Sequence, residues 1–504
     1  MKLRATWLGG IALALIATPL QAQDTPATTA PITEADLLQH IQILASDEYE
    51  GREPGTAGEA KTVGYLANQW AKAGLKGGLA DGTWYDPVEL IESYAGPSKL
   101  TFKNKKRTVR VAQSAMVLRS RDAATHLENL PLIFAGYGVD ADGKVAADVS
   151  GKLVLMLMKE PASGDLKDWR LRRDAVAKAG AAAVLAISSE KAPSARLRDA
   201  YSSNITIESR QSAAAVDGVI GEDGARALFK ASKVNWDDAM TQSATPNFAG
   251  LSLTPTANID ASTTVRRFKS HNVIGKIPGK FGSEKGAVLF LGHWDHLGIC
   301  AAEATEDRIC NGAVDNASGM AVLIEAAKRL AKTQPDRDIY FLGTTAEEMG
   351  LLGAYAFADK PVVPLDNIVA AFNVDSIAVA PKGEKSAILG RGTTPLDADI
   401  DKIAVSLGRT PEMGTDSNVM IQRQDGWALK SRGVPVVMLG GSFADMNKLM
   451  AYLQADYHGP GDEVGDKLVL SGAAEDADLH VAVGQHFSNV TKWPATTGTA
   501  EPTK

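Results

Sequence analysis

The sequence predicts an α/β fold in which a mixed, mainly parallel sheet is flanked by helices. Short apolar runs with the length and composition of buried strands support this prediction, and they cover residues 287–291, 339–342, 368–374 and 434–439. A helical pattern separates the first two runs, with Ser318 as its expected N-cap and apolar residues at helix spacing up to Leu330. In an open α/β sheet built in this way, ligands bind outside the carboxyl ends of the strands.

The composition is that of a conventional folded protein with more than one domain. The chain has 504 residues, of which 45% are hydrophobic, and single cores stop growing beyond about 250–300 residues. The formal charge of −7 argues against nucleic acid as a partner, because phosphate binding needs clustered Lys and Arg. We therefore expect two or three domains.

The first 22 residues have the layout of a signal peptide. Lys2 and Arg4 precede an apolar stretch from Leu8 to Leu20, and Ala22 offers a small residue for cleavage. An uncleaved anchor is the alternative, although the stretch is short for a membrane span. We expect a soluble periplasmic or secreted protein with no membrane span after cleavage.

The two cysteines, Cys300 and Cys310, are expected to form a disulfide. They share one loop, and in an oxidising compartment such thiols are natural partners. Closing so short a loop stabilises the fold by about 2–3 kcal/mol through the lost entropy of the unfolded chain. Free thiols and additional metal ligands are the alternatives; we favour the disulfide because the site described below has enough ligands without sulfur.

Residues 23–118 are expected to form the N-terminal part of the domain that residues 263–490 complete. After a flexible lead-in, Thr33 caps one predicted helix, and a second predicted helix ends at Gly74. Residues 84–118 look like short strands of uncertain pairing. The Thr/Pro-rich tail, residues 491–504, is expected to be disordered.

Residues 119–262 are expected to form a separate α/β module. Strands are predicted at 132–138, 152–158 and 183–187, with a helix from about 165 to 179. The stretch from Gly138 to Lys144 is similar to a phosphate loop or a calcium loop. We interpret it as a solvated turn, because the hydroxyl that would meet magnesium and the later calcium ligands are missing.

Histidines and carboxylates stand directly after several predicted strands. We expect five metal ligands: three of this kind, His293, Glu348 and Asp375, together with Asp315, which opens the helical pattern, and His458, which lies in a turn-rich loop. This donor set suits zinc, but five ligands are too many for one catalytic zinc with an open position. They suit two zinc ions about 3.5–4 Å apart that share a bridging carboxylate. Taken singly, each motif has a plainer interpretation, such as a capping turn or an acidic pair at a helix N-terminus.

Five strings in the sequence resemble the co-catalytic di-zinc exopeptidase family. They are Gly292–Gly298, Asp315–Gly319, Ala346–Gly353, Asn373–Asp375 and Tyr457–Glu463. The family includes bacterial secreted aminopeptidases and, more distantly, glutamate carboxypeptidase II, glutaminyl cyclase and the transferrin receptor. The likeness covers residues 265–490 well and 32–115 loosely, and the module between them resembles the protease-associated domain that many members carry as an insertion.

The resemblance implies a role for each ligand. His293 and Asp375 would hold one zinc, and Glu348 and His458 the other, with Asp315 bridging the two ions.

The same resemblance makes Glu347 the general base that takes a proton from the zinc-bound water. Asp295 would hydrogen-bond the far nitrogen of His293 and fix its tautomer, whereas we interpret His296 as structural. The family often carries Ser-Asp-His before the last core strand. Gln424-Asp425-Gly426 stands at the matching place here, which leaves the side-chain preference open.

These observations predict an exported zinc aminopeptidase that removes N-terminal residues from peptides. A carboxypeptidase or dipeptidase of the same fold is one alternative, and it would need an arginine patch, for which Arg391, Arg423 and Arg432 are available. A glutaminyl cyclase is less favoured, because those relatives usually bind one zinc. A receptor-like scaffold without catalysis is the alternative from another class. The sequence does not indicate the oligomeric state.

Overall fold

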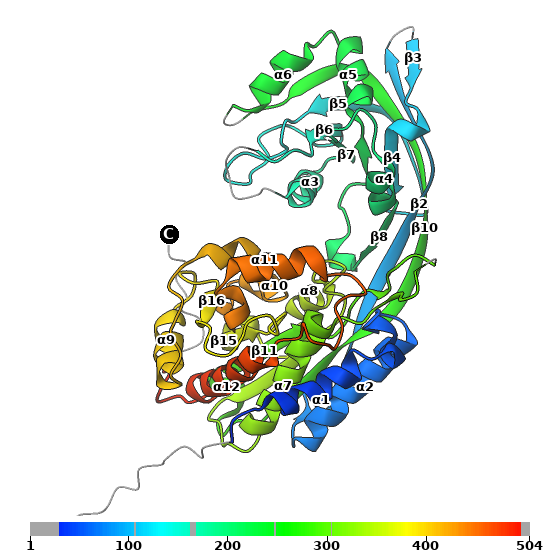
Figure 1. Cartoon of the computed structure of the whole chain (residues 1–504). Coiled ribbons are helices and arrows are strands. Elements are labelled where there is room, and N and C mark those ends of the chain that lie inside the picture. The colour runs from blue at the N-terminus through cyan, green and yellow to red at the C-terminus, as the bar shows by residue number, and fades with distance from the viewer. Residues whose placement is uncertain (1–29, 105–106, 162–167, 246–247, 304, 495–504) are drawn as a thin grey trace, which may run out of the picture. The chain divides into compact units, whose positions relative to one another are not determined.

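Among the residues that the structure describes, fifteen strands form one sheet, whose strands are drawn as arrows in Figure 1. The computed structural model describes residues 30–104, 107–161, 168–245, 248–303 and 305–494, and the chain from Ile32 onward forms one compact unit. The main path of the sheet has the order β16-β17-β15-β11-β14-β10-β5-β6-β7-β9-β4. The predicted signal peptide lies outside the described residues.

The four strands predicted from residue 287 onward are present and run parallel to one another. Strand β11 pairs in parallel with both β14 and β15, and β15 pairs in parallel with β17. Their bounds are β11 (Ala287–His293), β14 (Asp338–Thr344), β15 (Ile368–Asn373), β16 (Ala387–Leu389) and β17 (Val436–Gly440). The parallel order places the carboxyl ends of β14, β11 and β15 at one edge.

Helices cover both faces of this part of the sheet. Successive side chains of a strand point to opposite faces, so Val288 and Phe290 pack in one core while Leu289 and Leu291 pack in another. The first core is completed by α1 (Glu34–Leu44), α2 (Ala57–Lys72), α7 (Gly319–Leu330), α9 (Asp397–Ser406), α11 (Met446–Ala455) and α12 (Leu470–Phe487). The second is completed by α8 (Leu352–Asp359) and α10 (Gly426–Lys430). Burial on both faces explains why these strands are apolar throughout.

A second parallel set of strands lies in the part of the chain that we expected as an insert. Strands β5, β6, β7 and β9 are parallel neighbours, and β4 pairs with β9 at the edge. The elements are β4 (Met116–Ser120), β5 (Ala124–Phe134), β6 (Leu153–Leu157), α3 (Trp169–Lys178), β7 (Ala183–Ile187), α4 (Ala195–Ser202), β8 (Ser203–Thr206), β9 (Val216–Ile220), α5 (Glu222–Ala231) and α6 (Trp236–Ser243).

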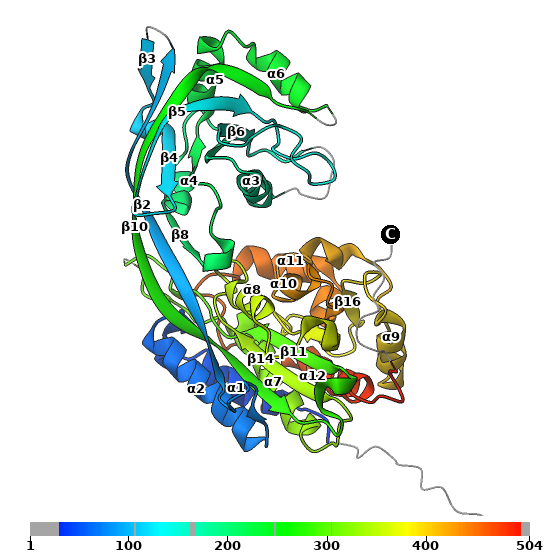
Figure 2. The same cartoon turned by 180° about the vertical axis from the view of Figure 1, so that it is seen from behind.

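Two long strands connect the two sets. The expectation of short strands over 84–118 was wrong for residues 85–104, which form one long strand, whereas β3 (Arg107–Arg110) and β4 are short. Strand β2 (Tyr85–Asn104) pairs antiparallel with β10 (Leu251–Ile277) from Tyr85 opposite Val273 to Lys103 opposite Thr256. Figure 2 shows the two strands side by side. Strands β2 and β10 have no long run of apolar residues. Their full length was therefore not recognised in the sequence. Strand β10 runs without a break through residue 262, where we expected the insert to end. The domain boundaries proposed from the sequence stay a prediction.

Smaller elements complete the description. They are β1 (Lys76–Gly77), β3 (Arg107–Arg110), β12 (Gly298–Ile299) and β13 (Ile309–Cys310). The start of the expected disordered tail is ordered: the ring of Trp493 packs on Phe487, and Arg337 donates a hydrogen bond to the carbonyl of Trp493. Residues 495–504 lie outside the described residues. Within the described residues, none of the helices is long and apolar enough to cross a membrane.

Candidate metal centre

Three neighbouring strands bring the predicted ligands to one edge of the sheet. His293 is the last residue of β11, and Asp375 follows the end of β15 by two residues. Glu347 and Glu348 lie in the turn between β14 and α8. Since the three strands are parallel neighbours, their carboxyl ends meet, which is where open α/β sheets bind ligands.

The segment that carries Asp315 is held by the side chain of the next residue. Asn316 donates hydrogen bonds to the carbonyls of His293 and Val374, and its oxygen accepts one from the N–H of Gly319. The Asp315–Asn316 peptide bond is cis. Ser318, our expected N-cap of α7, stands at that position but has helical dihedral angles and makes no capping bond. Its hydroxyl instead donates a hydrogen bond to the carbonyl of Val314.

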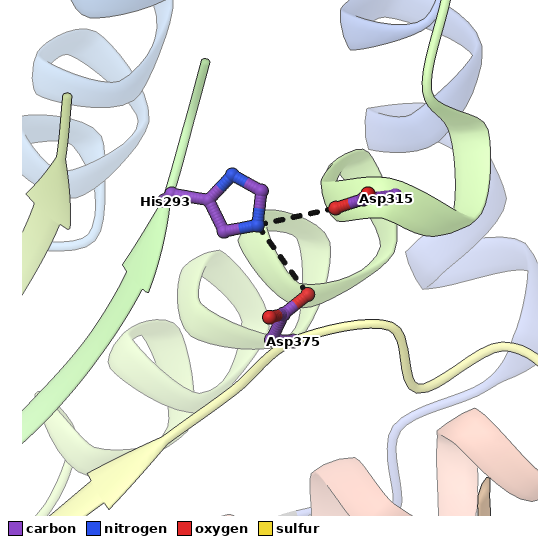
Figure 3. A group of neighbouring side chains, drawn as sticks. All are labelled: His293, Asp315 and Asp375. Atoms are coloured by element: carbon purple, nitrogen blue, oxygen red, sulfur yellow. Dashed lines mark hydrogen bonds and ion pairs between the residues drawn. The ribbon is translucent and has the colours of Figure 1, made fainter. Parts of the chain in front are cut away.

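The five predicted ligands converge around Asp315, which is 3% exposed. The Nε2 atom of His293 lies 3.2 Å from Oδ1 of Asp315 and 3.4 Å from Oδ1 of Asp375. Figure 3 shows this imidazole pointing between the two carboxylates. On the other side, the Nε2 atom of His458 lies 3.4 Å from Oδ2 of Asp315 and 2.8 Å from Oε2 of Glu348. Asp315 therefore uses one oxygen toward each pair.

His296 also belongs to this cluster, although we interpreted it as structural. It is fully buried, and its Nδ1 lies 2.6 Å from Oε1 of Glu348 and 3.9 Å from Oδ2 of Asp315. Its position fits a residue that orients Glu348, and it is close enough to belong to a group that could hold a metal ion. The motif His293-Trp294-Asp295-His296 did not distinguish these roles.

Asp295 does not make the contact that we expected. Its carboxylate is 3.9 Å from Nδ1 of His293 and instead accepts a hydrogen bond of 3.1 Å from the backbone N–H of Glu347. Nδ1 of His293 lies 3.1 Å from the backbone carbonyl of Asp295. Hence the backbone of Asp295 orients His293, while its side chain fixes the turn that carries Glu347. Burial raises the pKa of Asp295 to about 8.

The electrostatics of the cluster fit a bound cation. Burial, with the negative charges of Asp425, Glu348 and Asp375, raises the pKa of Glu347 well above its usual value. Against the effect of burial, hydrogen bonds from His293 and His458 lower the pKa of Asp315 well below its usual value. Such an excess of buried carboxyl groups is costly without a positive partner.

Two further observations also fit a bound cation at this cluster. Among the described residues, Oδ2 of Asp295, Nε2 of His296 and Oδ1 of Asp425 are buried without a hydrogen-bond partner. Asp425, in the string that departs from the family pattern, accepts a hydrogen bond from Thr344, and burial raises its pKa to about 6. Carboxylate oxygens and imidazole nitrogens that converge in this way are the donors that zinc takes.

A buried arginine that the sequence did not single out fixes the loops around the cluster. Arg52 is 1% exposed and donates hydrogen bonds to backbone carbonyls of Leu44, Trp294, Asn311 and Gly312. Burial lowers its pKa to about 10. Asp462 supports the same region, because its carboxylate accepts from the N–H groups of Val314 and Asp315. These contacts cross the fold, so no local pattern announces them.

The predicted disulfide is present beside this arginine. Cys300 and Cys310 are bonded, with their Cα atoms 5.8 Å apart. The preceding turn packs tightly on this loop: a Cβ added to Gly51, whose φ is +64°, would lie 2.6 Å from the carbonyl oxygen of Cys310. The disulfide loop therefore helps to set the position of Arg52.

Comparison with known proteins identifies relatives of this region. Residues 272–475 match peptidase family M28. A probable glutamate carboxypeptidase of Arabidopsis thaliana is 32% identical over 183 residues, which cover 35% of this chain and 23% of that protein. Aminopeptidase YwaD of Bacillus subtilis is 27% identical over 313 residues, which cover 61% of this chain and 54% of that protein. The chain thus spans about half, or less, of the length of these curated relatives.

Among solved structures, an aminopeptidase from Aneurinibacillus sp. strain AM-1 shares the fold. It superposes with a TM-score of 0.51 at 18% sequence identity, and the match covers 94% of this chain and 97% of that chain.

Proposed function

The chain belongs to peptidase family M28 through residues 272–475, and on this premise we propose that it is an exported zinc aminopeptidase. It hydrolyses the first peptide bond of peptides that have a free N-terminus and uses two zinc ions per chain. The similarity to the Bacillus aminopeptidase supports the activity. The signal-peptide layout of residues 1–22 and the disulfide support export to the periplasm or the medium.

The observation that carries this proposal is the two-sided contact of Asp315. One of its oxygens faces His293 and the other faces His458, which suits a carboxylate that bridges two ions. In this proposal His293 and Asp375 would hold one ion, and Glu348 and His458 would hold the other. When bound, a zinc pair supplies a water that ionises at neutral pH and polarises the scissile carbonyl.

Glu347 is the general base in this proposal. The hydrogen bond from its N–H to Asp295 holds the turn in place, and its carboxyl group lies in the cluster without being needed as a ligand. A buried carboxyl group with a raised pKa is suited to accept a proton from the attacking water. The same oxygen then returns the proton to the leaving amine.

The contacts of the available arginines bear on the carboxypeptidase alternative. Arg391 is paired with Asp401 at 2.8 Å, and Arg432 is paired with Asp359. Two of the three arginines that could receive a terminal carboxylate are therefore engaged in structural ion pairs, which favours the aminopeptidase.

Matched peptides with and without blocked ends test the proposal. We expect release of the first residue from a free tripeptide and from its C-terminal amide, no hydrolysis of the N-acetylated peptide, and loss of turnover with a chelator. Hydrolysis of the acetylated peptide from its C-terminus would instead support the carboxypeptidase. Protein that binds no zinc after dialysis against zinc would support the non-catalytic scaffold.

A further inference from the structure

A cavity of about 370 Å³, lined by several charged side chains, lies between the insert strands and the turn that follows Glu348. One wall comes from β4, α3 and the segment 204–212, and the other comes from residues 349–352 and 422–427 with Tyr355. The cavity thus lies between strands of the insert and two segments of the domain that carries the metal centre, residues 349–355 and 422–427.

The charged lining of this cavity is mainly positive. Six arginines and three aspartates line it. Two of the arginines are neutralised inside the wall, because Arg119 lies 3.2 Å from Asp217 and Arg173 lies 2.7 Å from Asp174. By contrast, Arg121, Arg210 and Arg423 have no carboxylate within 4.0 Å among the residues that the structure describes. We call the part of the cavity that these three residues line the arginine pocket.

Arg210 belongs to one wall of the cavity and packs against the other wall. Its guanidinium carbon lies 4.1 Å from the ring centroid of Tyr355 on α8. The preceding residue, Ser209, donates a hydrogen bond to Asp359 at the end of the same helix. Stacking on an aromatic face leaves the edge of the guanidinium group, with its N–H donors, free to meet an anion.

The opposite wall is continuous with the metal centre. The N–H groups of Gly350 and Leu351 donate to the carbonyl of Glu347 at 2.8 and 2.9 Å, so this turn carries the general base on one side and lines the cavity on the other. Arg423 precedes Asp425 by two residues in the second loop. Because residues 349–352 directly follow Glu348 in the chain, our proposal places the cavity within reach of a peptide bound at the cluster.

We propose that the arginine pocket binds a carboxylate of the peptide substrate, so that the enzyme favours acidic or short peptides. This inference rests on the proposed peptidase function. Arginine is suited to this role because its planar fork makes paired, charge-assisted hydrogen bonds to carboxylate oxygens. The carboxylate comes either from an Asp or Glu side chain or from the C-terminus of a short peptide.

Kinetics on matched peptides test the pocket and distinguish the two sources. Ala-Ala-Ala is compared with its C-terminal amide, and in the amide series Glu-Ala-Ala and Ala-Glu-Ala are compared with their Gln counterparts. The variants are Arg210→Gln, Arg423→Gln and Arg210→Lys. Arg196→Gln is the control, because Arg196 is exposed on α4 and does not line the cavity.

We expect wild-type protein to prefer one carboxylate-bearing series, and the position of the preferred carboxylate identifies its source. Each Gln variant should lower kcat/KM for that series about tenfold, mainly through KM, with little change for the neutral peptides. Arg210→Lys should retain part of the preference.

Other outcomes would overturn the inference. If kcat/KM falls equally for neutral and charged peptides in the variants, the pocket does not bind a carboxylate of the substrate. The same conclusion follows if wild-type protein shows no preference, and in both cases the peptidase function stands. If metal-loaded protein turns over none of the peptides, the proposed function itself fails.

Discussion

The Nε2 atom of His458 lies 3.4 Å from Oδ2 of Asp315, although the two residues stand far apart in the chain. His458 is the most exposed of the predicted ligands, with 37% of its side chain accessible. It lies in a loop, and its own backbone φ is +60°. This contact completes the second half of the cluster, so the proposed second metal site depends on a loop from the C-terminal region of the chain.

Replacement of Asp315, the proposed bridging carboxylate, should remove metal. In Asp315→Asn, the loss of the shared negative charge should reduce bound zinc from two ions per chain to one or fewer and abolish turnover, since ligand charge drives zinc binding. Metal analysis after dialysis measures the change, with exposed Asp416→Asn as the control. Two retained ions in the Asp315 variant would exclude the bridging role.

Replacement of the proposed base should separate turnover from metal binding. Glu347→Gln keeps the shape of the side chain but cannot accept the proton, so kcat should fall by about 10²–10⁴-fold while two zinc ions remain bound. Exposed Glu303→Gln serves as the control. Near-normal turnover by metal-loaded Glu347→Gln would eliminate Glu347 as the base.

Loss of the buried arginine should destabilise the loops around the cluster. Arg52→Gln leaves several buried carbonyls of the 294–312 region without donors, and we expect a loss of about 3 kcal/mol in the free energy of unfolding. Urea unfolding of metal-free protein measures this loss, and Arg196→Gln provides the surface control. Equal midpoints for Arg52→Gln and wild type would contradict the role assigned to Arg52.

A buried histidine away from the metal centre should make stability depend on pH. Nδ1–H of His480 donates to the carbonyl of Asp476, and burial lowers the pKa of the imidazole to about 4. The unfolded chain therefore binds a proton below about pH 6.5 that the folded chain does not bind. The stability that neutral His480 contributes is therefore complete above about pH 6.5 and is lost as the pH falls toward 4. The loss reaches about 2 kcal/mol in the free energy of unfolding at about pH 5.

His480→Gln tests this dependence because it keeps an N–H donor but does not titrate. Metal-free wild type and variant are unfolded with urea at about pH 7.5 and about pH 5. The wild type should lose about 2 kcal/mol more than the variant between the two conditions. Parallel losses would show that His480 does not carry the effect.

The elements with strong local signals could be predicted from the sequence. The apolar strands β11, β14 and β15 and the helix capped at Thr33 are present, and Thr33 forms a capping box with Asp36. The long strands β2 and β10 were missed because their alternation of polar and apolar residues resembles that of several short strands. Ser318 stands at the N-cap position of α7 as predicted but makes no capping bond, because its hydroxyl donates to the carbonyl of Val314.

The sequence by itself predicted the donor set of the candidate centre: His293, Glu348 and Asp375 follow apolar strands whose carboxyl ends meet in a parallel sheet. Asp315 and His458 were predicted from their motifs. Only the tertiary structure decided that Asp315 faces two histidines with different oxygens, that the carboxylate of Asp295 supports Glu347 instead of His293, and that His296 contacts Glu348. It also revealed Arg52 and the arginine pocket. These features join residues that are distant in the chain, and such contacts depend on packing and not on any local periodicity.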